Sequence, residues 1–125
     1  FYYGTKNWVL LKLKDNIKVK DLIPNTSEAL LNLDVTILHD LILNKVFGID
    51  KENMKSQRNL TYTRSIDEAI ESVDNKTSQC AFILNPTRVN EIRDVALASE
   101  KMPQKSTYFY PKLITGLIMN QIDFN

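Results

Sequence analysis

The sequence is poor in the residues that build covalent links and metal centres. It holds one cysteine, Cys80, and one histidine, His39, in 125 residues. A single cysteine excludes an internal disulfide, and within an apolar segment it normally behaves as a small hydrophobic residue. One histidine and one cysteine on different segments cannot supply the usual ligands of a zinc ion, so we expect no metal site.

Glycine is scarce as well, with Gly4, Gly48 and Gly116 as its only positions. Three glycines so far apart exclude a dinucleotide-binding fingerprint. Lys105-Ser106 resembles the end of a phosphate-binding loop, but Gln104 and Ser99 stand where that loop needs glycine. Neither pattern nominates a cofactor.

No charge of one sign dominates, because 16 basic and 15 acidic side chains leave a net charge of +1. Only four of the basic residues are arginines, whereas base recognition favours arginine, and this argues against nucleic acid as a partner. The apolar runs are too short to span a bilayer and residues 1–7 lack a targeting pattern, so we expect a cytoplasmic protein with no membrane partner. The length predicts a single domain, residues 1–125, and the first residue, Phe1, suggests the C-terminal fragment of a longer protein.

The first half of the chain predicts a hairpin followed by helices. Aromatic and aliphatic runs at residues 1–3 and 8–14 flank a turn-like stretch, which predicts an N-terminal hairpin. A short helix is expected over Ser27 to Leu31. A longer one is expected from Asp34 to Gly48, on apolar residues at helical spacing: Val35, Leu38, Ile42 and Val46. We expect residues 51–59 to be a loop or a single turn.

The second half predicts a β-α-β-α unit. Residues 60–64 are β-prone and residues 79–84 form a continuous apolar run, so both are expected to be strands, parallel and joined by a right-handed connection. Helices are expected to follow them, the first from Ser65 to about Val73 and the second over 89–99. Residues 107–110 and 117–120 are predicted to be closing strands. The fold class expected is therefore α+β, with helices packed against one mixed sheet.

A basic loop near the C-terminal end is the leading candidate site. Residues 101–122 contain three lysines and no carboxylate. Lysines and hydroxyl groups together can bind an anion, which nominates Lys105, Ser106, Thr107, Tyr108, Tyr110 and Lys112. The alternative is that residues 108–110 are ordinary strand residues and the lysines are solvated.

Three residues outside this loop are further candidates. Arg64 and Thr87 follow predicted strands at helix starts, where α/β sheets bind ligands, although helix capping explains Thr87 equally well. His39 falls on the apolar side of its predicted helix. It could transfer a proton, or it could be a packed residue whose ring N–H is satisfied by a backbone carbonyl.

The segment MPQKSTYFYPKL, residues 102–113, together with LDVTILHDLIL, FGID and AFILNPTRV, resembles a known family. This is the C-terminal part of a bacterial and archaeal domain-of-unknown-function family, the one numbered one thousand and fifteen. The resemblance covers about residues 33–119 and includes His39 and Asn85-Pro86, but Ser99 and Asn75 stand where that family leads us to expect glycine. It implies longer whole members, whose N-terminal part carries an Asp-Gly-His-His-Arg-like motif similar to partition-protein and serine-kinase phosphotransfer domains. That motif does not occur in this sequence.

Three functions remain open. The first is a non-catalytic domain whose Lys105 to Lys112 loop, with Arg64 and Thr87, binds a small phosphorylated or anionic ligand or docks the missing N-terminal part. The second is the half-site of a small-molecule kinase or other phosphotransferase, in which Lys105 neutralises charge and His39 or a tyrosine handles a proton. The third is a purely structural module whose aromatic residues pack inside.

Overall fold

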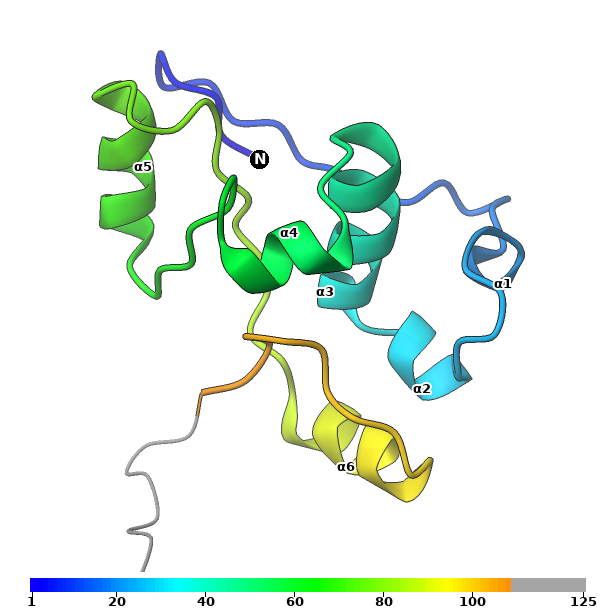
Figure 1. Ribbon diagram of the computed structural model, residues 1–125. Coiled ribbons are helices and arrows are strands. Elements are labelled where there is room, and N and C mark those ends of the chain that lie inside the picture. The colour runs from blue at the N-terminus through cyan, green and yellow to red at the C-terminus, as the bar shows by residue number, and fades with distance from the viewer. Residues whose placement is uncertain (109–125) are drawn as a thin grey trace, which may run out of the picture.

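The computed structural model describes residues 1–108, and in this part the chain is built of short helices joined by loops (Figure 1). The helical segments are α1 (Val19–Leu22), α2 (Glu28–Leu31), α3 (Asp34–Ile37), η1 (Leu38–Val46), α4 (Lys51–Ser56), α5 (Ile66–Asp74) and α6 (Val89–Leu97). None of these helices combines the length and apolar character needed to cross a membrane.

The predicted α+β fold with a mixed sheet is wrong for residues 1–108, which contain no β-strand. The N-terminal hairpin is reduced to one isolated bridge between Tyr2 and Trp8. Val9 still exchanges two backbone hydrogen bonds with Phe1, but residues 10–14 continue without a partner strand, and Leu10 is 92% exposed. The β-prone composition could not create a strand here because a strand needs a neighbouring ladder of hydrogen bonds.

The predicted β-α-β unit is wrong for the same reason. Residues 60–64 have no strand pairing, and residues 79–84 make only one antiparallel bridge, from Ala81 to Tyr2. The Tyr2 N–H donates to the Ala81 carbonyl at 2.8 Å, and the Ala81 N–H donates back at 2.7 Å. The Tyr2 hydroxyl also donates to Asp74 at 2.6 Å, so the buried Tyr2 attaches the N-terminal segment to the end of α5. The predicted closing strand 117–120 and residues 109–110 lie outside the described residues.

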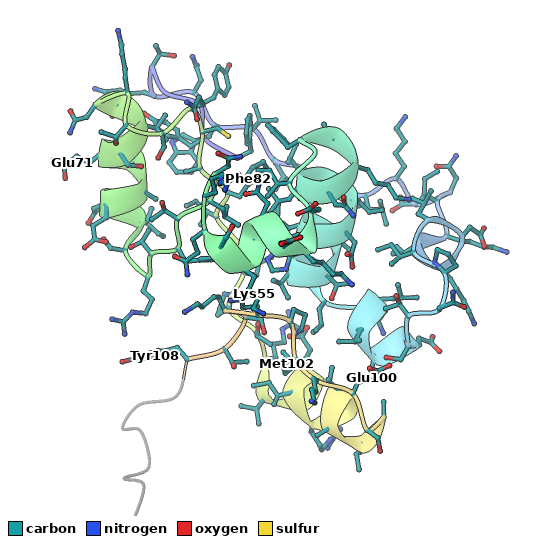
Figure 2. All side chains as sticks on the ribbon, in the orientation of Figure 1. Lys55, Glu71, Phe82, Glu100, Met102 and Tyr108 are labelled. Atoms are coloured by element: carbon teal, nitrogen blue, oxygen red, sulfur yellow. The ribbon has the colours of Figure 1, made fainter. Side chains whose placement is uncertain are left out.

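Two small apolar clusters hold the helices together. Leu33, Val35 and Val95 join the α2–α3 region to α6, and Met102 packs against them. The second cluster lies further along the chain and consists of Leu38, Leu43 and Met54, with Leu60 and Phe82 among the residues packed against it. Figure 2 labels Met102 and Phe82 in these two parts of the molecule. The continuous helix formed by α3 and η1 contributes to both clusters.

The predicted helix from Asp34 to Gly48 exists, but most of it is wound as a π-helix. In η1 the turn widens, and the Phe47 N–H donates to the Ile42 carbonyl five residues back. This winding places Leu38 and Leu43, five residues apart, in the core, whereas Val46 is 75% exposed. The predicted apolar face of 3.6-residue period is therefore correct at Val35, Leu38 and Ile42 and wrong at Val46.

Helix starts were predicted more accurately than strands. The Ser27 side chain accepts a hydrogen bond from the Leu30 N–H at the start of α2, and Ser65 accepts one from the Glu68 N–H at the start of α5. The spacing of Ser65 and Glu68 also predicts that the Glu68 carboxylate accepts from the Ser65 N–H, but this bond is absent, because that carboxylate accepts from the Thr63 hydroxyl at 2.5 Å. The predicted loop at 51–59 begins with the six-residue helix α4, capped by Asp50.

Candidate functional site

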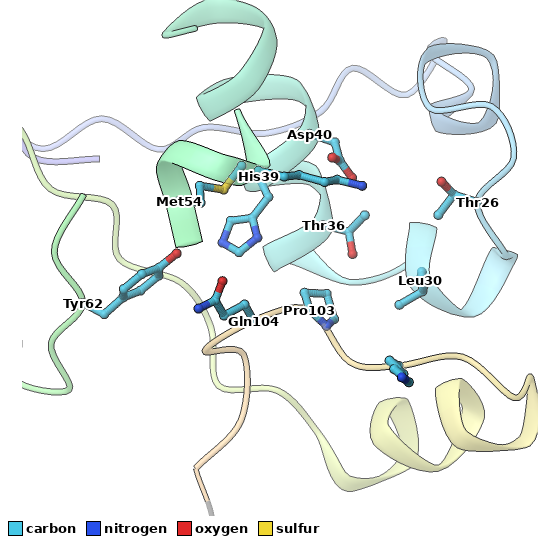
Figure 3. A pocket seen from close by; sticks show the side chains of 11 residues that line it. Thr26, Leu30, Thr36, His39, Asp40, Met54, Tyr62, Pro103 and Gln104 are labelled. Carbon is cyan, nitrogen blue, oxygen red and sulfur yellow. The ribbon is translucent and has the colours of Figure 1, made fainter. Parts of the chain in front are cut away.

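A cavity of about 320 Å³ lies between α3–η1, α4 and the segment that follows α6 (Figure 3). Its volume is near the lower end of the range for small-molecule pockets, about 300–1,000 Å³. It is lined by Thr26, Leu30, Thr36, His39, Asp40, Lys51, Met54, Tyr62, Lys101, Pro103 and Gln104. Leu30 and Met54 connect the cavity to the two apolar clusters, so its walls are anchored in the core.

One helix face supplies three of the polar side chains. Thr36 lies in α3, and His39 and Asp40 follow in the first residues of η1. Residues three and four positions apart share a helix face, which brings all three to the same wall of the cavity. Figure 3 shows the His39 ring in the middle of the cavity, with Tyr62 and Gln104 pointing toward it from other segments.

Two hydroxyl groups at this cavity lack hydrogen-bond partners among the described residues. Thr36 is 4% exposed, and neither its Oγ1 nor the Tyr62 hydroxyl oxygen is hydrogen-bonded. A buried polar atom without a partner costs about 1–3 kcal/mol, and native proteins contain few of them. Both atoms belong to residues that line one cavity, as expected of a site that binds a polar group.

Burial also controls the ionisation of this site. Desolvation lowers the pKa of the half-buried His39 below its usual 6.5, although the nearby Asp40 carboxylate opposes the change. The imidazole is therefore neutral at pH 7, with one nitrogen able to donate and the other able to accept a hydrogen bond. Desolvation likewise raises the pKa of Tyr62, which keeps its hydroxyl protonated.

The charged side chains of the cavity are Lys51, Lys101 and Asp40. Within residues 1–108 none of them forms a salt bridge, and the only ion pairs join Lys12 to Asp15 and Arg93 to Asp94. Two lysines and one carboxylate give the lining a formal charge of +1. The cavity thus presents unpaired charges of both signs with an excess of positive charge.

The described part of the predicted basic loop, residues 105–108, lies next to this cavity but does not line it, whereas the two residues before it do. Pro103 and Gln104 line the cavity, whereas Lys105 is exposed and does not. The Ser106 hydroxyl donates to the Pro103 carbonyl at 2.6 Å and so closes a turn within the loop. Thr107 is partly buried, and Tyr110 and Lys112 lie outside the described residues.

Arg64 and Thr87, which the sequence analysis grouped with the loop as candidate site residues, both contact described residues of the loop. The Thr87 hydroxyl donates to the Ser106 carbonyl at 2.9 Å, and the Arg64 guanidinium lies 4.1 Å from the centre of the Tyr108 ring. Both contacts are internal and hold the loop against the preceding chain. Neither Arg64 nor Thr87 lines the cavity.

Of the candidate residues that the structure describes, only His39 lines the cavity. Sequence reasoning missed the hydroxyl groups of Thr36 and Tyr62 and the charges of Asp40, Lys51 and Lys101. The spacing of Thr36 and Asp40 from His39 on one helix face was a local signal that could have nominated these two. The others reach the cavity from distant segments and carry no local signal.

Two further sites are not supported by residues 1–108. No group of three or more His, Cys, Asp or Glu side chains lies together in this part of the chain in a way that could hold a metal ion. Cys80 does not line the cavity, and desolvation raises the pKa of its thiol, which disfavours the nucleophilic thiolate.

Comparisons with protein-family models, with curated proteins and with solved structures found no match to this chain.

Proposed function

We propose that this domain binds a small anionic ligand in the cavity around His39, without catalysing its conversion. The observation that carries the proposal is the pair of unpartnered hydroxyls, on Thr36 and Tyr62, at one cavity that also holds two unpaired lysines. Lysine ammonium groups attract an anion, and hydroxyls and a neutral imidazole complete its hydrogen bonds without adding charge.

The Lys105 to Lys112 loop has a different part in this proposal. Lys105 is exposed and outside the cavity, so it is free to contact the N-terminal part of a longer protein. Membership of the family numbered one thousand and fifteen belongs to the same proposal, as does a cytoplasmic location. Pro103 and Gln104, which line the cavity, belong to the segment 102–113 on which that resemblance rests.

The test is a titration of the 125-residue chain with inorganic phosphate at constant pH. Because the sequence holds one histidine, the imidazole signal of His39 in a proton NMR spectrum needs no assignment. We expect a saturable shift of this signal and a matching heat of binding by calorimetry. Absence of both in the wild-type chain would refute the proposal.

Variants of one helix separate the cavity from the general surface charge. Lys51 and Lys55 both lie in α4, but only Lys51 lines the cavity. We expect Lys51→Met to weaken phosphate binding and Lys55→Met to leave it unchanged. Equal losses in the two variants would indicate nonspecific attraction of the anion. Lys105→Ala is expected to leave phosphate affinity unchanged, which distinguishes the cavity from the loop.

A second candidate is the half-site of a phosphotransferase, and the neutral imidazole of His39 in the cavity favours it. A neutral histidine can accept a proton from a substrate hydroxyl. This function predicts transfer activity only when the chain is joined to a phosphotransfer domain, and loss of that activity in a folded His39→Gln variant. If His39→Gln binds the ligand as the wild type does, and neither the isolated nor the joined chain shows transfer activity, the phosphotransferase function is excluded and the non-catalytic function is supported.

The purely structural alternative predicts that the aromatic residues of the loop pack inside the protein. Tyr108 is 54% exposed and lies against Arg64. Phe109 and Tyr110 lie outside the described residues. A structural module gives no saturable response to phosphate, so the titration separates this alternative from the first proposal.

A further inference from the structure

We propose that the ligand is an acidic amino acid, a small molecule that carries one ammonium group and two acidic groups. This inference rests on the proposed function, and it explains a feature of the cavity that binding of an anion alone does not explain. That feature is Asp40, whose carboxylate lines a cavity proposed to attract anions.

Asp40 is half-buried and has no hydrogen-bond or ion-pair partner among residues 1–108. In a site for inorganic phosphate or a plain dicarboxylate, this negative charge would repel the ligand and lower its affinity. It would be neutralised within the protein if a lysine lay in contact with it, but Lys51 and Lys101 line the same cavity without forming that pair. The unpaired carboxylate fits a ligand that brings its own cation.

The charged side chains of the cavity also indicate how many acidic and ammonium groups the ligand carries. Two lysines and one carboxylate are complemented by two acidic groups and one ammonium group. Such a ligand has a net charge of −1, opposite to the +1 of the lining. An α-amino acid with an acidic side chain is the simplest molecule of this kind, and the cavity volume of about 320 Å³ is suited to a ligand of small size.

The lining also includes two side chains whose buried hydroxyls still have a hydrogen bond to make, and such groups suit the acidic groups of a ligand. The Thr36 and Tyr62 hydroxyls lack partners, and each has one hydrogen to donate. Figure 3 shows Tyr62 and Gln104 pointing toward the His39 ring, whereas Asp40 lies at another part of the cavity wall. The Tyr62 and Gln104 side chains are therefore separated from the Asp40 carboxylate, as recognition of separate acidic and ammonium groups requires, while Thr36 lies on the Asp40 side of the ring.

The experiment compares L-aspartate with succinate, which has the same two carboxylates and no ammonium group. Inorganic phosphate and L-alanine are added as further probes, and binding is measured by calorimetry and by the His39 imidazole signal at constant pH. For the wild-type chain we expect L-aspartate to bind more tightly than succinate by at least about tenfold. L-alanine, which lacks the second acidic group, is expected to bind more weakly than L-aspartate.

The variant Asp40→Asn is expected to change the affinities for L-aspartate and for succinate in opposite directions. It removes the partner of the ammonium group, so L-aspartate affinity is expected to fall by about tenfold, and it removes a repulsive charge, so succinate affinity is expected to rise. Glu52→Gln is the matched control, because Glu52 is an exposed carboxylate of α4 outside the cavity. This control is expected to change neither affinity.

The wild-type comparison needs no variant and remains decisive if Asp40→Asn fails to fold. Succinate or phosphate binding as tightly as L-aspartate would overturn the amino-acid inference and leave anion binding intact. A parallel gain of both affinities in Asp40→Asn would overturn it as well. Absence of a phosphate response would refute the proposed function, whereas phosphate binding without tighter binding of L-aspartate would refute only this inference.

Discussion

Replacing Thr36 by valine is expected to stabilise the protein while weakening its binding site. Thr36 is 4% exposed, and its hydroxyl has no partner among the described residues. Valine has nearly the same shape, with a methyl group in place of the hydroxyl. The substitution therefore removes a desolvated polar atom without opening a cavity or changing the β-branched character of the side chain.

The magnitude follows from the burial of that hydroxyl. An unsatisfied buried polar group costs about 1–3 kcal/mol, and threonine and valine have similar helix propensities, so little of this gain is lost in α3. We expect the free energy of unfolding of Thr36→Val to exceed that of the wild type by about 1–3 kcal/mol. For a chain of this size each kcal/mol raises the melting temperature by roughly 4 °C.

Urea unfolding followed by circular dichroism measures this difference directly. Thr61→Val is the matched control, because Thr61 is exposed and does not line the cavity. We expect its free energy of unfolding to stay within about 0.5 kcal/mol of the wild-type value. A loss of stability in Thr36→Val would show that the hydroxyl is satisfied in the folded protein, and the argument for a ligand at this position would fail.

Three further predictions concern the core, a turn and the only histidine. Leu33 is 2% exposed, so Leu33→Ala is expected to lower the free energy of unfolding by about 2–5 kcal/mol, and a loss below 1 kcal/mol in urea unfolding would contradict the assigned core. Gly4 has a φ of +91°, and a methyl group added there would make only ordinary van der Waals contact with Val73, at 3.7 Å, so Gly4→Ala is expected to cost about 1–2 kcal/mol from backbone conformation, and a neutral result in the same assay would speak against this turn. The pKa of His39 is lowered below 6.5 by burial, so the unfolded chain binds more protons between the two pKa values. The contribution of His39 to stability is therefore complete above pH 6.5 and declines as the pH falls toward the pKa of the folded state. His39→Gln should lack this decline, and identical pH profiles of the two proteins, measured by urea unfolding between pH 5 and 8, would refute it.

Local signals in the sequence predicted α2, the α3–η1 helix, α5 and α6, because the causes of these helices lie within a few residues, but they did not predict the short helices α1 and α4. Ser27 and Ser65 were recognised as helix starts, and both accept the hydrogen bond expected of a cap. The winding of η1 could not be found in this way. A period of 3.6 residues places Val46 in the core, whereas the wider turn places Leu43 there.

Strand predictions failed because a strand depends on a partner that the local sequence does not specify. The runs at 8–14 and 79–84 have strand composition, yet only Trp8 and Ala81 form a bridge, each with Tyr2. The cavity could not be predicted from the sequence for a similar reason. Thr36 and Tyr62 are 26 positions apart, and nothing in either segment predicts that both hydroxyls border one cavity.

The single imidazole signal of His39, followed during a phosphate titration of the wild-type chain and of Thr36→Val, tests the central claim most directly. The claim is that the cavity around His39 binds an anion with the help of the Thr36 hydroxyl. It predicts a saturable shift in the wild type and a weaker apparent affinity in the more stable variant. A wild-type signal that does not respond, or identical titration curves for the two proteins, would contradict it.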